Sequence, residues 1–277
     1  DMKGIRDPVG MKGVRLEAEV HIVTGAIASA QNIHRCIEKA GYTVADIVLE
    51  PLASSYSVLN EDQKELGCII IDIGGGTSDI AMFYEGCIRH TSVVALGGKN
   101  VTNDMAIVLR TPLDAAEALK IEHGRVLHSE ADRDAYVTVT DVNHVSDRKI
   151  SKNLLVDIIQ PRIAEILSLA YEEIKKSDYI NLMTTGLVLT GGGSLCPGTV
   201  ELAEEIFNMP VRLGVPKGFT GMIEESQNPQ SATGVGLIIY GKEHMHEIDG
   251  GLSKGESGAF ENIKKRFRRW FNTLSVY

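Results

Sequence analysis

An apolar run that leads into three glycines constrains the fold of this chain more than any other feature. Residues 68–71 have the pattern of a short buried strand, and after the sequence IDIGGGTSD a second apolar run begins at Ile80. Glycine permits close backbone approach and unusual backbone angles, so three in a row indicate either a tight turn or a cradle for an anion. The β-branched and aromatic residues that follow favour a strand over a helix. The glycines are therefore expected in a hairpin between two strands.

The residues around the glycines favour the cradle, although a plain turn remains an alternative. A Walker-type phosphate loop is excluded, because neither the required lysine nor a helical pattern follows the glycines. A simple hairpin turn usually manages with two residues. The longer loop here offers backbone amides, the hydroxyl of Thr77, and the carboxylates of Asp72 and Asp79. Two acids beside a phosphate are chemically reasonable when Mg²⁺ lies between them.

A second glycine cluster follows another buried strand. Residues 186–194 combine the apolar run GLVLT with GGGS, and residues 199–207 have the spacing of a helix. Alone, this order of strand, glycine loop and helix is a weak dinucleotide-like signal. A purely structural turn between strand and helix is the alternative.

Between the two clusters, residues 111–114 have the pattern of a helix start, with Thr111 as the cap and Pro112 in the first turn, and the helix is expected to continue through residues 115–124. Glu117 and Lys120 are three residues apart on this helix and share a face. On spacing alone, a solvated ion pair is the simplest interpretation.

Periodicity predicts further elements along the chain. We expect a long core helix over residues 151–176, capped by Ser151 and bent or interrupted near Pro161. We also expect a helix from Ser29 that ends at Gly41. The other predicted strands cover residues 15–24, 47–49, 80–89 (broken at Glu85 and Gly86) and 91–96, and short alternating runs lie within the polar segment 122–150.

Composition excludes several classes of protein. The 277 residues are 43% hydrophobic and 23% charged, which suits a folded protein with one or two cores. No apolar run approaches the ~18 residues that span a bilayer, and no signal segment follows the amino terminus. The four cysteines are far apart and the eight histidines show no metal-ligand spacing, so we expect reduced thiols in a cytosolic protein and no metal site besides Mg²⁺.

Charge is distributed unevenly along the chain. The net charge is −9, but residues 259–277 carry five basic residues and one acid, so this tail contributes +4 and the remainder −13. An acidic body would repel a phosphate backbone, which argues against nucleic acid as a partner.

The tail has the pattern of an amphipathic helix. Apolar residues gather on one helical face: Phe260, Ile263, Phe267, Trp270, Phe271 and Leu274. Basic residues fall mostly on the other: Lys264, Lys265, Arg266, Arg268 and Arg269. Such a helix lies in the headgroup region of a membrane, where each basic residue near anionic lipid contributes ~1 kcal/mol. The alternative, a terminal helix packed on its own domain, is disfavoured by the glycine- and serine-rich stretch at residues 247–258, which indicates a flexible linker.

Six segments together resemble a known superfamily. In chain order they are EPLASSYSVL, DIGGGTSD, LGGKNVT, DAAEALKIEHG, LVLTGGGS and NPQSATGVGL. They are similar to the nucleotide-site elements of the actin, heat-shock-chaperone and sugar-kinase superfamily, and most similar to those of the FtsA family of bacterial cell division proteins. The resemblance covers nearly the whole chain from about Pro8. It implies an α/β, actin-like (ribonuclease-H-like) ATPase fold with an incomplete first lobe, a complete second lobe and a carboxyl-terminal amphipathic helix.

The resemblance also implies roles for particular residues toward ATP and Mg²⁺. The second phosphate-binding hairpin would consist of Asp72, Gly74, Gly75, Gly76, Thr77 and Asp79. Asp72 would lie near Mg²⁺ and would bind it either directly or through a water molecule. Glu117 and Lys120 would meet the ribose and adenine. The adenosine pocket would be lined by Gly191, Gly192, Gly193 and Ser194, and residues 230–240 would form a closing helix between the lobes. No residue is assigned as a catalytic base.

One element of the superfamily has no match. No D-x-G-T type hairpin occurs in residues 1–66. The chain is therefore expected to be the carboxyl-terminal part of a longer protein and, holding one hairpin of two, to bind ATP–Mg²⁺ weakly or not at all. The implied divisions are residues 1–25 (end of the extra subdomain of the first lobe), 26–66 (first-lobe core), 67–97 (second-lobe core with the hairpin), 98–182 (outer subdomain), 183–229 (second-lobe core with the adenosine loop), 230–243 (closing helix), 244–258 (linker) and 259–277 (membrane helix).

The resemblance favours a membrane tether over an enzyme. The expected protein has at most weak ATPase activity, polymerises into actin-like filaments, and holds the FtsZ ring and other division proteins at the cytoplasmic face of the cell membrane at the division site. Phe260, Ile263, Lys264, Lys265, Phe267, Arg268, Trp270 and Phe271 would bind anionic lipids. A sugar kinase or a heat-shock-type chaperone ATPase is the alternative. It is disfavoured because a kinase has no use for such a tail and a chaperone continues into a large substrate-binding domain.

Overall fold

The computed structural model describes residues 5, 8–130, 134–142, 147–218 and 224–250. The chain divides into two compact units, Asp1–Ile239 and Tyr240–Tyr277. Every strand among the described residues lies in the first unit, and the long helix α8 (Ala232–Gly250) begins in it and continues into the second.

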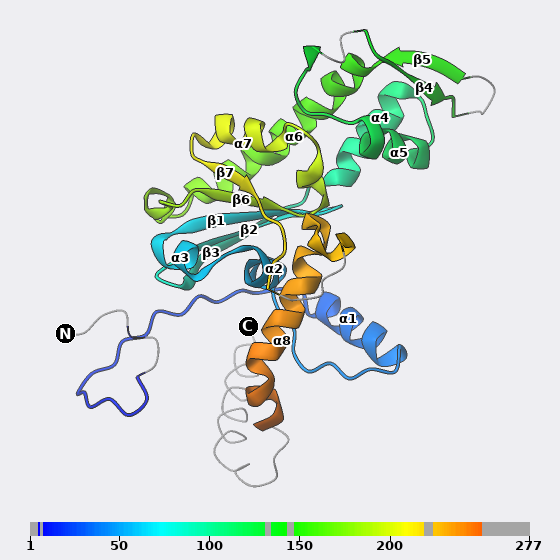
Figure 1. The fold of residues 1–277 in the computed structure, drawn as a ribbon. Coiled ribbons are helices and arrows are strands. Elements are labelled where there is room, and N and C mark those ends of the chain that lie inside the picture. The colour runs from blue at the N-terminus through cyan, green and yellow to red at the C-terminus, as the bar shows by residue number, and fades with distance from the viewer. Residues whose placement is uncertain (1–4, 6–7, 131–133, 143–146, 219–223, 251–277) are drawn as a thin grey trace, which may run out of the picture. The chain divides into compact units, whose positions relative to one another are not determined.

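The core of the first unit is a five-stranded sheet in the order β3-β2-β1-β6-β7 (Figure 1). β1 (Cys68–Ile73), β2 (Ser78–Tyr84) and β3 (Cys87–Val94) form an antiparallel meander. β6 (Leu187–Thr190) and β7 (Val211–Leu213) extend the sheet in parallel from β1. The expected meander is confirmed, and its second turn lies at Glu85 and Gly86.

Helices cover both faces of this sheet, which explains the unbroken apolar sequence of β1. On one face, Ile69, Ile71 and Ile73 pack with α6 (Lys152–Lys175) and α7 (Thr199–Phe207). On the other face, Cys68 and Ile70 pack with residues of α2 (Glu50–Val58), and α3 (Glu61–Leu66) contacts β2. All six residues of β1 are buried, as expected for a central strand covered on both sides.

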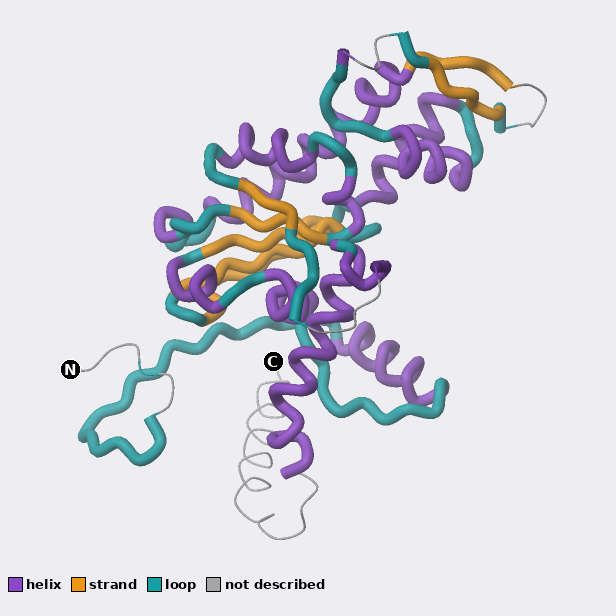
Figure 2. Tube along the Cα trace, in the orientation of Figure 1, coloured by secondary structure: helices purple, strands orange, loops and turns teal. Residues whose placement is uncertain are grey.

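A smaller assembly of helices and two strands follows the meander. It consists of α4 (Gly98–Leu109), α5 (Leu113–His123), the hairpin of β4 (Tyr136–Thr140) and β5 (Asp147–Ser151), and the first turns of α6 (Figure 2). Val137, Val139 and Ile150 face its interior. We refer to this assembly as the outer subdomain.

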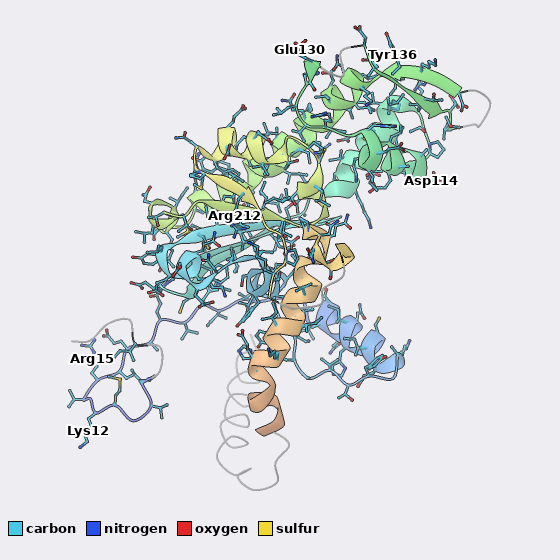
Figure 3. All side chains as sticks on the ribbon, in the orientation of Figure 1. Lys12, Arg15, Asp114, Glu130, Tyr136 and Arg212 are labelled. Carbon is cyan, nitrogen blue, oxygen red and sulfur yellow. The ribbon has the colours of Figure 1, made fainter. Side chains whose placement is uncertain are left out.

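Two predicted strands are wrong. Residues 15–24 and 47–49 form no strand, and the first regular element in the described part of the chain is α1 (Ile27–Lys39). The irregular course of the early stretch is visible around Lys12 and Arg15 in Figure 3. Residues 15–24 alternate between apolar and polar residues as a strand would, but their backbone pairs with no neighbouring strand. Their contacts with the rest of the protein are made by side chains, for example the ion pair of Glu19 with Arg89. Alternation alone cannot supply the backbone partners that a strand needs.

A third strand prediction misplaced its boundaries. Residues 80–89 and 91–96 were expected as separate strands, yet residues 87–94 form the single strand β3. The break falls only at the turn, where Glu85 and Gly86 both have positive φ angles.

Most predicted helices are confirmed with corrections at their ends. α6 begins with Ser151 accepting a hydrogen bond from Asn153, as expected, but it continues through Pro161 without interruption. The cap of α5 is wrong, because its N-cap is Pro112 and the Thr111 hydroxyl binds the carbonyl of Thr140 instead. α7 covers the predicted residues, and α1 ends before Gly41 at φ +85°.

The predicted closing helix and linker also change. The helix α8 begins at Ala232, after a 3-10 turn at Pro229–Ser231, and runs to Gly250. Residues 244–250 are therefore helical, where a linker was expected. The remainder of the predicted linker and the whole tail helix lie outside the described residues.

Candidate functional site

The three glycines form the turn of the β1–β2 hairpin. Asp72 lies opposite Asp79 in this hairpin, and the amide of Gly74 donates to the carbonyl of Thr77 at 2.9 Å. Gly75, Gly76 and Thr77 are exposed at the tip. The predicted hairpin is confirmed, while its role toward phosphate stays a prediction.

The first turn of α4 decides which groups of the hairpin remain available. The amides of Gly98 and Lys99 donate to the carbonyls of Gly74 and Gly75 at 2.9 and 2.8 Å. In a trans peptide the carbonyl and the next amide point in opposite directions, so the amides of Gly75 and Gly76 face away from α4. Neither amide donates a hydrogen bond within the described part of the chain. Two adjacent free amides are suited to an anion, so the turn also has the form of a cradle.

Three carboxyl groups gather at the base of the hairpin. Asp72 is 3% exposed and accepts hydrogen bonds from Ser54 at 2.7 Å and Thr233 at 3.3 Å. Burial raises the pKa of Asp72 despite these hydrogen bonds, and Asp79 raises it further. Burial likewise raises the pKa of Asp79.

Glu50, at the start of α2, belongs to the same group, although its sequence context predicted no role for it. Neighbouring atoms partly desolvate its exposed carboxyl group, and the charges of Asp79 and Asp72 repel it, so its pKa is also raised. An ionised carboxylate whose pKa is raised can accept a proton from water. The Glu-Pro pair that opens the segment EPLASSYSVL was the signal that could have pointed to it.

The second glycine loop closes tightly on the end of β1. Gly191 has φ +81°, and a β-carbon there would lie 2.3 Å from Oδ1 of Asp72. A β-carbon on Gly193 would lie 2.3 Å from the Ile73 side chain. A β-carbon on Gly192 would lie 3.3 Å from the Gln230 side chain, while the buried Ser194 hydroxyl donates to the Gly191 carbonyl at 2.7 Å. The loop thus lies beside the hairpin, and the hydrogen bond from Ser194 to Gly191 stabilises the conformation of the loop.

Glu117 and Lys120 form a partly buried network, which replaces the solvated ion pair of the simplest interpretation. The Lys120 ammonium donates to Glu117 at 2.7 Å, to Thr102 at 2.8 Å and to the Gly98 carbonyl at 3.0 Å. Burial alone would raise the pKa of Glu117, but hydrogen bonds from Lys120 and Thr102, with the charges of Lys120 and Lys99, lower it. Lys120 therefore ties α5 to the turn of α4 that holds the hairpin.

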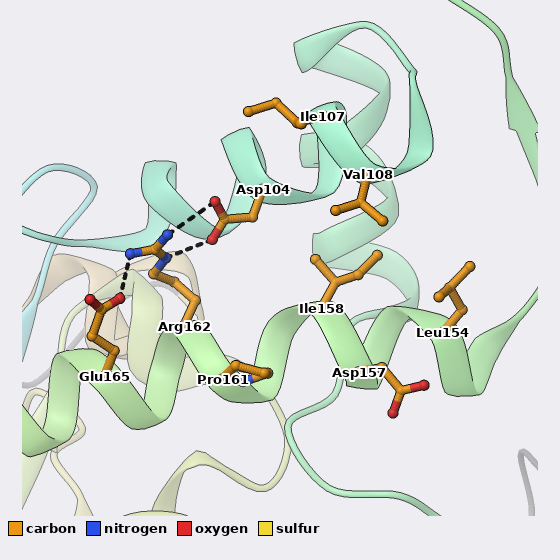
Figure 4. Close-up of a pocket in the computed structure, with 9 residues that line it drawn as sticks. All are labelled: Asp104, Ile107, Val108, Leu154, Asp157, Ile158, Pro161, Arg162 and Glu165. Atoms are coloured by element: carbon orange, nitrogen blue, oxygen red, sulfur yellow. Dashed lines mark hydrogen bonds and ion pairs between the residues drawn. The ribbon is translucent and has the colours of Figure 1, made fainter.

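A groove lies apart from these loops, between α4 and α6 in the outer subdomain (Figure 4). Its volume is about 530 Å³. At one end Arg162 binds Asp104 with two hydrogen bonds of 2.6 and 3.1 Å and also pairs with Glu165. The remaining lining is largely apolar and comprises Ile107, Val108, Leu154, Ile158 and Pro161, with Asp157 at its margin.

Three further expectations can be compared with the described residues. All four cysteines are free, with Cys68 buried and Cys36 exposed. Within these residues, no three His, Cys, Asp or Glu side chains are grouped to hold a metal ion. No helix in the described ranges has the length and apolarity to cross a bilayer. The residues predicted to bind lipid, from Phe260 to Phe271, lie outside them.

Comparison with solved structures shows an actin-like ATPase fold. The structure of MreB5 of Spiroplasma citri bound to ADP aligns with a TM-score of 0.68 and 18% sequence identity, over 81% of this chain and 68% of that one. The MamK double helical filament aligns with a TM-score of 0.56 and 16% identity, over 77% of this chain and 65% of the other. The predicted fold class is therefore confirmed, apart from its terminal helix.

Comparison of sequences identifies the family. The family model described as cell division protein FtsA matches residues 69–236, and the model of the SHS2 domain inserted in FtsA matches residues 1–24. The FtsA protein of Pseudomonas aeruginosa is 46% identical over 98% of this chain, and that of Escherichia coli K12 is 38% identical over 97%. The chain spans 66% of the length of each of these two relatives. It belongs to the FtsA family of cell division proteins.

Proposed function

We propose that this chain serves, within the full-length protein, as the nucleotide-binding second lobe and membrane anchor of an actin-like tether for FtsZ. By full-length protein we mean a chain of the length of the curated relatives that contains these residues. Family membership favours this proposal over a sugar kinase or a chaperone. Filament formation is part of the proposal and is supported by the MamK filament among the structures of the same fold.

The nucleotide part of the proposal rests on one observation, the pair of free amides at the hairpin tip. These amides and Thr77 would hold the phosphates, and the loop of Gly191, Gly192 and Gly193 beside the hairpin would receive the adenosine. Structures of the same fold carry ADP and AMPPNP, which supports ATP as the ligand. Mg²⁺ would offset the phosphate charge. Asp72 would approach it through water, because the residue is 3% exposed and its carboxylate already accepts a hydrogen bond from Ser54.

The tether part rests on the amphipathic pattern of residues 259–277. We expect Trp270→Glu in the full-length protein to abolish sedimentation with anionic vesicles, because it places a charge in the apolar face that would enter the membrane. Trp270→Phe keeps an aromatic residue there and should preserve sedimentation. Unchanged pelleting of the glutamate variant would remove the anchor from the proposal.

The groove between α4 and α6 is the surface that we assign to FtsZ. Ile107 is 74% and Val108 55% exposed, although both border a groove. Exposed apolar residues that line a groove are typical of protein interaction sites. The Asp104–Arg162 ion pair at the end of the groove would orient FtsZ on this otherwise apolar surface.

A pair of matched substitutions tests this assignment. We expect Ile107→Glu in the full-length protein to weaken binding of FtsZ at least tenfold in a fluorescence anisotropy titration, since it puts a charge in the apolar lining. Ile121→Glu is the control, because Ile121 is also 74% exposed but does not line the groove. Equal affinities for both variants would place the FtsZ contact elsewhere.

A further inference from the structure

The side chain of Lys99 lies along the hairpin that we propose to bind phosphate. Its methylene groups come within 3.6–4.0 Å of the position that a β-carbon would take on Gly75. Its backbone amide fixes this arrangement by donating to the Gly75 carbonyl at 2.8 Å. The lysine is exposed, and within the described part of the chain its ammonium makes no ion pair within 4.0 Å. A long cationic side chain therefore lies against Gly75 of the hairpin with its charge uncommitted.

The electrostatics of the site favour a cation at this position, in addition to the Mg²⁺ of the proposed nucleotide complex. Asp72, Asp79 and Glu50 together place three carboxyl groups at the base of the hairpin. A polyphosphate would meet this negative potential on entering. Lys120 is not available to offset it, because its three donors already bind Glu117, Thr102 and Gly98.

The influence of Lys99 extends toward the other end of the proposed site. Its charge is among the causes that lower the pKa of Glu117, yet Glu117 forms its hydrogen bonds with Lys120 and Thr102. Lys99 thus lies between the hairpin and Glu117 without being the ion-pair partner of that carboxylate. This is the region that the polyphosphate of a nucleotide would cross between the two ends.

We propose that Lys99 binds the polyphosphate of the nucleotide directly and is a phosphate-positioning residue of the hairpin. The inference rests on the proposed nucleotide function. Lysine acts toward phosphate as a mobile point charge, so it can follow the ligand while the hairpin amides stay fixed.

The test measures MgATP binding by calorimetry in the full-length protein at several salt concentrations. We expect Lys99→Met to weaken MgATP binding roughly tenfold, the size of one hydrogen bond to a charged group, and to reduce the salt dependence of the affinity. Lys99→Arg should retain most of the affinity. The control Lys149→Met removes the same charge from exposed β5 in the outer subdomain and should bind like the unmodified protein.

Each result has a distinct meaning. Unchanged affinity in Lys99→Met, or a loss that leaves the salt dependence intact, overturns the role of Lys99 while the nucleotide site stands. An unmodified full-length protein that binds no MgATP overturns the proposed nucleotide function itself, and the role of Lys99 with it.

Discussion

Gly236→Ala will destabilise this protein by about 3 kcal/mol or more, although it adds only one methyl group. A β-carbon on Gly236 would lie 1.8 Å from the carbonyl oxygen of Ala53 and 2.5 Å from its carbonyl carbon. These are backbone atoms inside α2, so no side-chain rotation can relieve the contact. The helices α2 and α8 would have to separate.

Separation of the two helices would also break polar contacts between them. The hydroxyl of Ser57 donates to the Ala232 carbonyl at 2.7 Å, and the hydroxyls of Ser54 and Thr233 lie 3.0 Å apart. These bonds are buried or partly buried, so losing them adds to the steric cost. Thermal unfolding of the chain, followed by circular dichroism, measures the combined effect.

The same helix provides a matched control. Gly234 is two residues away, is exposed, and would bring a β-carbon within 4 Å of no other atom. Gly234→Ala should therefore stabilise the protein by roughly 0.5–1 kcal/mol, through helix propensity alone. If the two variants changed the melting temperature in the same direction, the close crossing of α2 and α8 would be wrong.

The elements that the sequence predicted correctly are those whose pattern is local and complete. β1 and β6 are covered on both faces, so their contiguous apolar residues are a direct sign of burial. α7 was predicted with its bounds because apolar spacing and a following turn are both encoded within a few residues. The hairpin also follows from local chemistry, since glycines separate two runs with strand propensity.

The wrong predictions concern features that depend on distant partners. Residues 15–24 alternate like a strand, but a strand exists only when another backbone pairs with it. Thr111 has the chemistry of a cap, yet the Thr140 carbonyl, 29 residues away, takes its hydroxyl.

The site shows the same division between local and distant information. Spacing placed Glu117 and Lys120 on one helical face, which the structure confirms. Spacing along α5 could not show that Lys120 also binds Gly98 and Thr102, because these two residues belong to α4. The glycine-rich start and the β-branched residues of α4 gave no clear helical signal in the sequence. The contact between Gly191 and Asp72 likewise depends on the parallel pairing of β1 with β6.

Asp72→Asn is expected to have opposite effects on stability and on ligand binding. Burial and the charge of Asp79 raise the pKa of Asp72 in the folded protein, so the ionised carboxylate is unfavourable there. A raised pKa means that its contribution to stability is fully present below the pKa of the unfolded chain and is lost as pH rises through the folded value. At pH 7.5 the asparagine variant should therefore be more stable by on the order of 1 kcal/mol.

The pH dependence distinguishes this cause from a change in packing. Asparagine has nearly the same shape and keeps an oxygen that can accept the hydrogen bond from Ser54. The difference in melting temperature between variant and parent should shrink as pH falls and Asp72 becomes protonated. A difference that persists unchanged into acid would mean that the charge of Asp72 is not its source.

The same substitution should weaken ligand binding, because the negative charge of Asp72 that lowers stability is the charge that Mg²⁺ would require. In the full-length protein, we expect Asp72→Asn to lower MgATP affinity at least tenfold and to remove most of its dependence on Mg²⁺. Calorimetry with and without Mg²⁺ separates the effect of the substitution on ATP binding from its effect on Mg²⁺ binding. A more stable variant that binds MgATP as tightly as the parent would exclude Asp72 from the metal site. A less stable variant would instead show that Ser54 and Thr233 require the charged form, so that the carboxylate acts mainly as a link between α2, β1 and α8.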